Sequence, residues 1–245
     1  LVRHFQVQSL EGFGCTGLGP GIGAAGAVLH YVQQELRNRV DHVRRIRVGN
    51  PDEFLVLDEA TVRNLELVES HASRPGQRGP TLLRVMDQTL TAMGARRLRH
   101  WILRPLRDVS SIVQRHDAIQ VLLENQSCFR TVRAELGKVK DVERLLSRLH
   151  GQSGNPREVQ ALSTSLQALP GLQESLAGSG SFFLKQLAEQ MHPLPELTQK
   201  LESWLVEEPP ANVKDGGIIR EGIHPELDEL RGASTEGKNW LAAFQ

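Results

Sequence analysis

A glycine-rich stretch near the start of this sequence has the residue types that could most directly bind a phosphate. Residues 21–26 are GIGAAG, which matches the G-x-G-x-x-G pattern of backbone amides approaching a pyrophosphate at a helix N-terminus. That pattern must directly follow a buried strand, whereas residues 12–20 are polar and glycine-rich. Asp41, the candidate ribose ligand, comes before the next expected strand and not after it. We therefore favour a glycine-rich start of a helix over a nucleotide-binding loop.

The densest group of basic side chains, in residues 96–107, has the chemistry to meet DNA phosphates. It consists of Arg96, Arg97, Arg99, His100, Arg104 and Arg107. At helical spacing these side chains do not share one face, and Leu98, Trp101 and Ile102 are expected to point inward. An ordinary solvated amphipathic helix therefore explains the segment, and ion pairs between helices or domains are a third possibility.

The spacing of the histidines, cysteines and acids supports neither a metal site nor a catalytic site. None of the nine histidines pairs with His, Cys or an acid in a metal-binding pattern, and neither Cys15 nor Cys128 has a plausible catalytic partner. Acids near the last expected helix are explained by helix capping and the helix dipole. We therefore predict no catalytic, cofactor-binding or metal-binding residue in this chain, which we expect not to be an enzyme.

Composition limits the partners and the compartment. Lys plus Arg equals Asp plus Glu at 29 each, so no overall field attracts nucleic acid or an anionic membrane, and any DNA contact must be local. Two cysteines are too few for a disulfide framework, which favours the cytoplasm, and no apolar run is long enough for a membrane span. The chain begins without Met and stops within a helical pattern, so we expect a chain trimmed at both ends.

The elements that must position these residues are expected to be mostly helices. Aromatic residues make up only 4%, and Leu recurs at spacings of three and four, which favours helix-on-helix packing. A loop is expected over residues 12–26, with a helix from Ala24 to near Asn38. Two short strands, flanking a turn at residues 49–52, are expected to form a β-hairpin at a domain junction.

The rest of the chain is expected to be helical after a polar stretch over residues 71–80. One helix, capped by Thr81, should continue past Gly94 and end before Pro105. The expected starts of later helices are Asp108 or Ser110, Asp141, Pro156, Phe182 and Pro225, with an interruption around Pro193 and Pro195.

Three stretches in the same order resemble one family, the MutS DNA mismatch-repair proteins, and most closely the bacterial form. The first is HFQVQSLEGFG at residues 4–14, followed by AAGA at 24–27. The second runs from LDEATVRNLEL at 57–67 through TLL at 81–83 and TAMGARRL at 91–98 to RPLRD at 104–108. The third is DGGIIREG at 215–222 with ELDELR at 226–231. Residues 163–214 match only in general helical character.

The resemblance implies a mainly α fold, in which a multi-helix core domain with a long lever helix follows the α/β end of a connector domain and a short β-hairpin. Residues 1–45 would belong to the connector domain and residues 46–224 to the helical core. Residues 225–245 would begin a lever helix that leads to a clamp domain outside this chain.

The resemblance also implies a scaffold that links ATP-dependent state changes to the clamping of mismatched DNA. ATP and Mg²⁺ would bind elsewhere in a longer protein, and mismatched duplex DNA would be gripped by other domains. A homodimer, other mismatch-repair proteins and no membrane are the implied partners. Residues at domain or DNA-backbone contacts would include Asn64, Arg96, Arg97, Arg104, Arg220 and Glu221. An autonomous nucleic-acid-binding module that uses residues 96–107 is the alternative.

Overall fold

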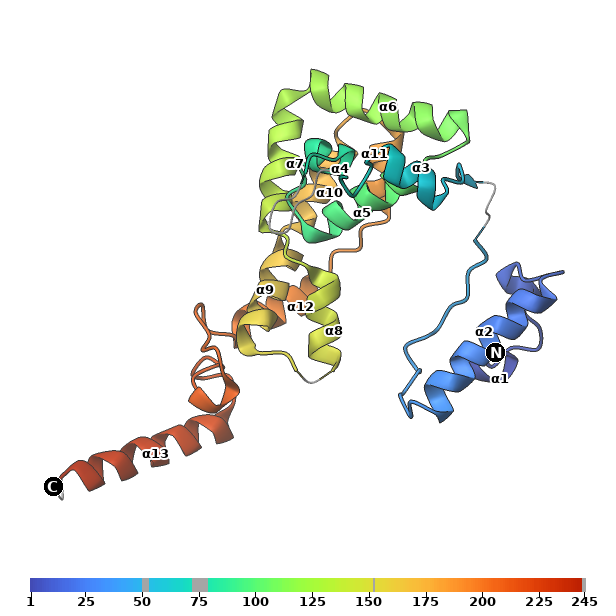
Figure 1. Ribbon diagram of the computed structural model, residues 1–245. Coiled ribbons are helices and arrows are strands. Elements are labelled where there is room, and N and C mark those ends of the chain that lie inside the picture. The colour runs from blue at the N-terminus through green and yellow to red at the C-terminus, as the bar shows by residue number, and fades with distance from the viewer. Residues whose placement is uncertain (50–52, 72–78, 152, 244–245) are drawn as a thin grey trace. The chain divides into compact units, whose positions relative to one another are not determined.

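The computed structural model describes residues 1–49, 53–71, 79–151 and 153–243, and its backbone is mainly helical, as predicted (Figure 1). The chain divides into two compact units, Leu1–Glu53 and Phe54–Gln245. The domain limits at residues 45 and 224 stay predictions. No helix of the described residues is long and apolar enough to cross a membrane.

The first unit contains α1 (Val2–Phe5), a 3-10 turn (Glu11–Phe13) and α2 (Gly19–Gln34). The predicted loop over residues 12–26 is wrong from Gly19 onward, because α2 already begins there, and the helix ends at Gln34, short of Asn38. Pro20 lies in the first turn, where a missing N–H costs no hydrogen bond. Only the glycines before the helix, Gly14 and Gly17, need the left-handed backbone that glycine favours.

The predicted β-hairpin is also wrong for the described residues. Residues 39–49 form no strand, and Phe54 instead forms an isolated antiparallel bridge with Leu106. Beside it the Leu55 amide donates to the Pro105 carbonyl at 2.8 Å. Most of the predicted turn, residues 50–52, lies outside the described residues. The apolar alternation was real, but Phe54 pairs with a residue from a distant part of the chain, through an isolated bridge and not a hairpin.

The main core of the second unit is built by four helices. They are α6 (Val109–Glu124), α7 (Gln126–Lys138), α10 (Leu169–Ala177) and α11 (Phe182–Glu189). α10 packs against α7 and α11, while α6 contacts both of these helices. The buried cluster between them consists of Ala118, Val132, Val139, Ala168, Leu172, Leu176, Leu184 and Ala188.

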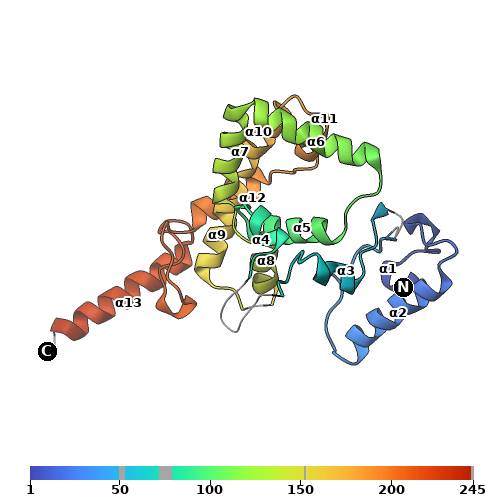
Figure 2. The ribbon, with the colours of Figure 1, turned by 45° about the horizontal axis from the view of Figure 1, so that its top comes forward.

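A second group of helices packs around α9 (Pro156–Gln167), which contacts both α8 (Val142–His150) and α12 (Pro195–Trp204) (Figure 2). Asn155 caps α9 in a reciprocal pair with Glu158, and Pro156 occupies the first turn as predicted. Leu145 and Leu162 are the buried leucines of α8 and α9. After α12, a 3-10 turn (Val213–Asp215) precedes α13 (Pro225–Ala243), which begins at Pro225 as predicted.

Three helices lie between Phe54 and this core: α3 (Glu59–Asn64), α4 (Leu82–Met86) and α5 (Ala92–Leu103). The single helix predicted from Thr81 is wrong, because α4 and α5 are separate. Thr81 Oγ1 accepts from the Arg84 amide and Thr91 Oγ1 from the Gly94 amide, so each helix has its own N-cap. Because the apolar periodicity continues through both helices, nothing in the sequence pattern indicated that Thr91 caps a second helix.

Candidate functional site

The basic segment predicted from the sequence forms α5 and the turn after it, and the structure divides its arginines among different tasks. Arg96 makes ion pairs with α8: its guanidinium donates to both Asp141 carboxylate oxygens at 2.8 and 2.7 Å. It also donates to Glu143 Oε2 at 2.6 Å. Arg96 therefore joins α5 to the start of α8, which is the ion-pair alternative considered for this segment.

Asp141 has two structural partners, because its side chain also accepts from the Arg144 amide as the N-cap of α8. The guanidinium of Arg96, and to a smaller extent the Arg144 amide, lower the pKa of Asp141 from 3.8 to about 2. The two carboxylates raise the pKa of Arg96 in turn, Asp141 more than Glu143. A depressed carboxylate pKa means that the ionised form stabilises the fold.

Replacement of Asp141 by asparagine is expected to destabilise the second unit at neutral pH and to have a shrinking effect in acid. The wild-type contribution is complete above the unfolded-state pKa of 3.8 and shrinks as the pH falls through the folded-state pKa of about 2, below which Asp141 is protonated in both states. Urea unfolding of both proteins between pH 7 and pH 2 measures this. A difference that stays constant down to pH 2 would contradict the assigned ion pair.

Arg97 lies against Trp101, one helical turn further along α5. Its guanidinium carbon is 5.8 Å from the Trp101 ring centroid, and that of Arg115, from α6, is 4.0 Å from the same centroid. The prediction that Trp101 points inward is wrong, since its side chain is 37% exposed. Sequence reasoning missed Arg115, whose position in the sequence gave no sign that it meets this tryptophan.

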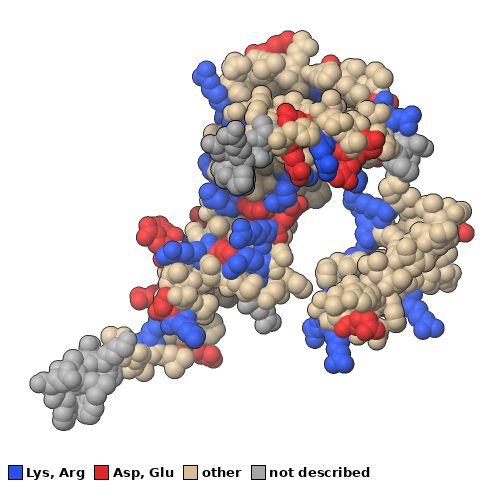
Figure 3. All heavy atoms as spheres, viewed as in Figure 1, with Lys and Arg blue, Asp and Glu red and all other residues tan. Residues whose placement is uncertain are grey.

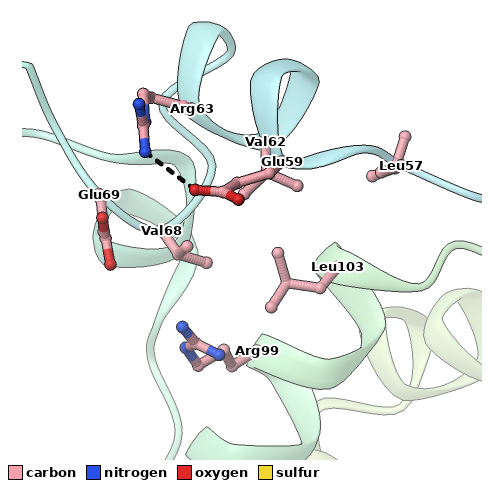
Figure 4. Close-up of a pocket in the computed structure, with 8 residues that line it drawn as sticks. All are labelled: Leu57, Glu59, Val62, Arg63, Val68, Glu69, Arg99 and Leu103. Carbon is pink, nitrogen blue, oxygen red and sulfur yellow. Dashed lines mark hydrogen bonds and ion pairs between the residues drawn. The ribbon is translucent and has the colours of Figure 1, made fainter.

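Arg99 lines a cleft of about 420 Å³ between α3 and α5 (Figure 4). Arg99 and Leu103 project from α5, while Val62 and the ion pair between Glu59 and Arg63 lie on α3. Asn64, the predicted contact residue of α3, is exposed at the end of that helix and does not line the cleft. Arg104 is also exposed, and its amide closes α5 by donating to the His100 carbonyl.

Arg220 takes part in a hydrogen-bonded connection after α12. Leu205 and Ile219 form an antiparallel bridge, and the Val206 amide donates to the Ile218 carbonyl at 3.1 Å. The Arg220 amide donates to the Trp204 carbonyl at 2.8 Å, and its Nε donates to the Leu205 carbonyl at 2.6 Å. Residues 218–220 are therefore held against the end of α12.

The same segment is tied to α13 by an arginine and an acid. Arg231 donates from Nη2 to the Ile219 carbonyl at 2.6 Å and from Nη1 to Asp228 Oδ1 at 3.0 Å. Asp228 Oδ2 accepts from the Gly222 amide at 2.8 Å. Glu221 lies beside them, lining a hollow of about 400 Å³. Arg231 was not predicted as a contact residue, although the motif ELDELR contains it. We call Leu205, Ile219, Arg220, Asp228 and Arg231 the α12–α13 junction.

The six predicted contact residues thus do not converge on one site. Arg96 and Arg97 are neighbours on α5 with different partners, while Arg220 belongs to the α12–α13 junction and Glu221 lines the hollow beside it. On the face shown in Figure 3, Lys and Arg side chains are interspersed with Asp and Glu, so no extended basic surface is seen there. Among the described residues there is also no group of three or more His, Cys, Asp or Glu side chains that could hold a metal.

Comparison with known proteins identifies the family. Residues 60–242 match MutS domain III. The whole chain is 39% identical to the DNA mismatch repair protein MutS of Salinibacter ruber, covering 27% of that protein, and 41% identical to the one of Symbiobacterium thermophilum, covering 28%. It is 40% identical to the one of Lachnoclostridium phytofermentans, covering 26%. The chain therefore spans only about a quarter of these relatives. It belongs to the MutS family of DNA mismatch-repair proteins, and residues 60–242 are its domain III.

Proposed function

We propose that this chain is the scaffold through which a DNA mismatch-repair protein links ATP-dependent state changes to the clamping of mismatched DNA. The family supports a role in mismatch repair. The observation that carries the linkage is the α12–α13 junction, where main-chain and side-chain hydrogen bonds tie both helices to the same short segment. Elements tied in this way move together as a body, so a rotation at one end displaces the other.

The proposal assigns the chemistry to other parts of a longer protein. This chain is not an enzyme, ATP and Mg²⁺ bind outside it, and mismatched DNA is gripped beyond the far end of α13. The relatives are DNA mismatch repair proteins and are between three and four times as long as this chain, which supports this division. A homodimer in the cytoplasm, acting with other mismatch-repair proteins, completes the proposal.

Replacement of Arg231 by methionine in the full-length protein tests the linkage. The change keeps an apolar stem of similar length but removes the hydrogen bonds to the Ile219 carbonyl and Asp228. We expect mismatched DNA to bind with unchanged affinity without ATP, while the change that ATP causes in this affinity shrinks by at least about fivefold, the lower end of typical couplings between sites. Fluorescence anisotropy of a labelled mismatched duplex, with and without ATP, measures both quantities.

A matched control is Arg130, an exposed arginine of α7 for which the described residues offer no hydrogen bond or ion pair. Arg130→Met removes one charge without touching the α12–α13 junction and should leave the ATP response intact. An Arg231→Met protein that is folded by circular dichroism and still responds fully to ATP would refute the linkage.

The autonomous nucleic-acid-binding module is the less supported function. Arg96, one of its six basic side chains, is neutralised by Asp141 and Glu143. Arg99 lines the cleft between α3 and α5, whereas Arg97 lies against Trp101. The segment therefore does not act as one basic face.

A further inference from the structure

Two arginines from different helices lie against a single exposed tryptophan. Arg115 of α6 stacks at 4.0 Å from the Trp101 centroid, and Arg97 of α5 lies at 5.8 Å. Such contacts between a guanidinium and an indole are attractive, which explains why each arginine is held at this place. It does not explain why two like charges share one ring.

The hydrogen-bond donors of both arginines remain unused. A stacked guanidinium contacts the ring with its face, and its N–H groups point outward from its edge. Among the described residues, neither the Arg97 nor the Arg115 guanidinium donates a hydrogen bond or forms an ion pair. Arg133 is a useful contrast, because it lies over Phe129 at 5.7 Å but donates from Nη1 to the Gln88 carbonyl.

The positive charge at this place lacks a counter-charge within the part of the chain that the structure describes. Asp117, the acid nearest to Arg115 along the chain, is two residues away on α6, a spacing at which helix side chains do not face each other, and it forms no ion pair with Arg115. Asp108 accepts from the hydroxyls of Ser110 and Ser111 and from the Ser111 amide. Burial lowers the pKa of Arg115, and the like charge of Arg97 lowers it further. The Arg115 guanidinium nevertheless stays ionised near neutral pH. The pair is therefore mutually repulsive until an anion approaches.

We propose that Arg97, Trp101 and Arg115 form a binding site for the phosphates of a DNA backbone. Arginine edges match phosphate oxygens through paired hydrogen bonds, and desolvation of a half-buried guanidinium strengthens them. Base stacking is disfavoured as the mode of binding, because arginines already lie against the indole. Arg104, the exposed residue that ends α5 three positions after Trp101, adds a further positive charge close by in the sequence.

The site goes beyond the scaffold role, since it gives domain III a DNA contact of its own. It rests on the mismatch-repair family and on the geometry around Trp101, and it does not involve the α12–α13 junction. The Arg231 experiment and the experiment below can therefore fail independently of each other.

Titration of the 245-residue chain with a labelled duplex at about 50 and 200 mM salt tests the site. A phosphate contact contributes a slope of about −0.9 to the logarithm of affinity against the logarithm of salt concentration. We expect Arg97→Gln and Arg115→Gln each to weaken binding at low salt and to reduce the slope by about 1. Over this range, each lost contact then removes roughly a 3.5-fold dependence on salt.

Control variants separate this site from general electrostatics and from misfolding. Arg130→Gln removes the same charge elsewhere and should leave slope and affinity near wild type. Arg97→Lys and Arg115→Lys keep the charge and should keep most of the salt slope, because counterion release depends on charge, while losing some affinity with the paired hydrogen bonds. Folding of each variant is checked by circular dichroism.

Nuclear magnetic resonance of the two arginine side chains tells whether the site binds DNA, an acidic peptide or free phosphate. The Nε–H resonances of Arg97 and Arg115 should shift on addition of the duplex, equally for matched and mismatched DNA, because phosphate contacts carry no sequence information. A polyglutamate peptide that binds the same residues as tightly as DNA would overturn the assignment to nucleic acid, as would saturation by free inorganic phosphate with no preference for DNA. Undetectable binding at 50 mM salt, or a Gln variant indistinguishable from Arg130→Gln, would overturn the site itself.

Discussion

Replacement of Leu172 by alanine is expected to lower the free energy of unfolding of the helical core by about 2–5 kcal/mol. Leu172 lies on α10, the helix that packs against both α7 and α11, and its side chain is 3% exposed. Removal of three carbons there loses apolar burial and leaves a cavity, because the neighbours from three helices relax only in part. Hydrogen exchange of amides in α7, α10 and α11 measures the change without a contribution from the first unit.

A matched control exists on the outer face of α6. Leu123 has the same side chain but is 62% exposed, so Leu123→Ala should change the stability by no more than about 0.5 kcal/mol. Equal effects of the two substitutions would mean that α10 is not the centre of the core.

Replacement of both Gly21 and Gly23 by alanine is expected to stabilise α2 by about 1–2 kcal/mol in total. Each glycine within a helix costs about 0.5–1 kcal/mol relative to alanine, because more backbone freedom is lost on folding. A Cβ atom at either position would meet no described atom within 4 Å. Helicity at 222 nm and the protection of the α2 amides from hydrogen exchange should both increase.

This substitution also separates the two explanations of the GIGAAG sequence. If the glycines allowed a phosphate to approach the backbone, added methyl groups would abolish nucleotide binding, whereas we expect calorimetry to detect no ATP or NAD binding by either protein. Gly14→Ala is the opposite control, since Gly14 has a φ of 73° in the turn before α2. A side chain there costs about 1–2 kcal/mol in the left-handed region.

Much of the helical framework could be predicted from local sequence. Asp108 and Asp141 cap α6 and α8 as expected, and Pro156 and Pro225 stand where α9 and α13 begin. These features depend on a side chain and amides two or three residues away, so they are visible in a short window of sequence. The errors in this framework came from the same window: periodicity joined α4 to α5, and glycine content concealed the start of α2.

The contacts that matter for the candidate sites could not be predicted in this way. The sequence indicated that Arg97 was basic and surface-exposed, but only the fold brings Arg115 from the next helix onto Trp101. Arg96 looked equivalent to Arg97 until packing placed Asp141 and Glu143 against it. Phe54 looked like part of a local hairpin and pairs instead with Leu106.

By itself, then, the sequence determined the helical class, most helix starts and the family resemblance, because capping, proline geometry and ordered motifs are properties of neighbouring residues. The tertiary structure alone decided which arginines are neutralised by acids, which share an indole, and how Arg231 ties α13 to the segment beside α12. The physical reason is that charge compensation and packing depend on distances in space, and residues far apart in the chain acquire those distances only when the helices pack.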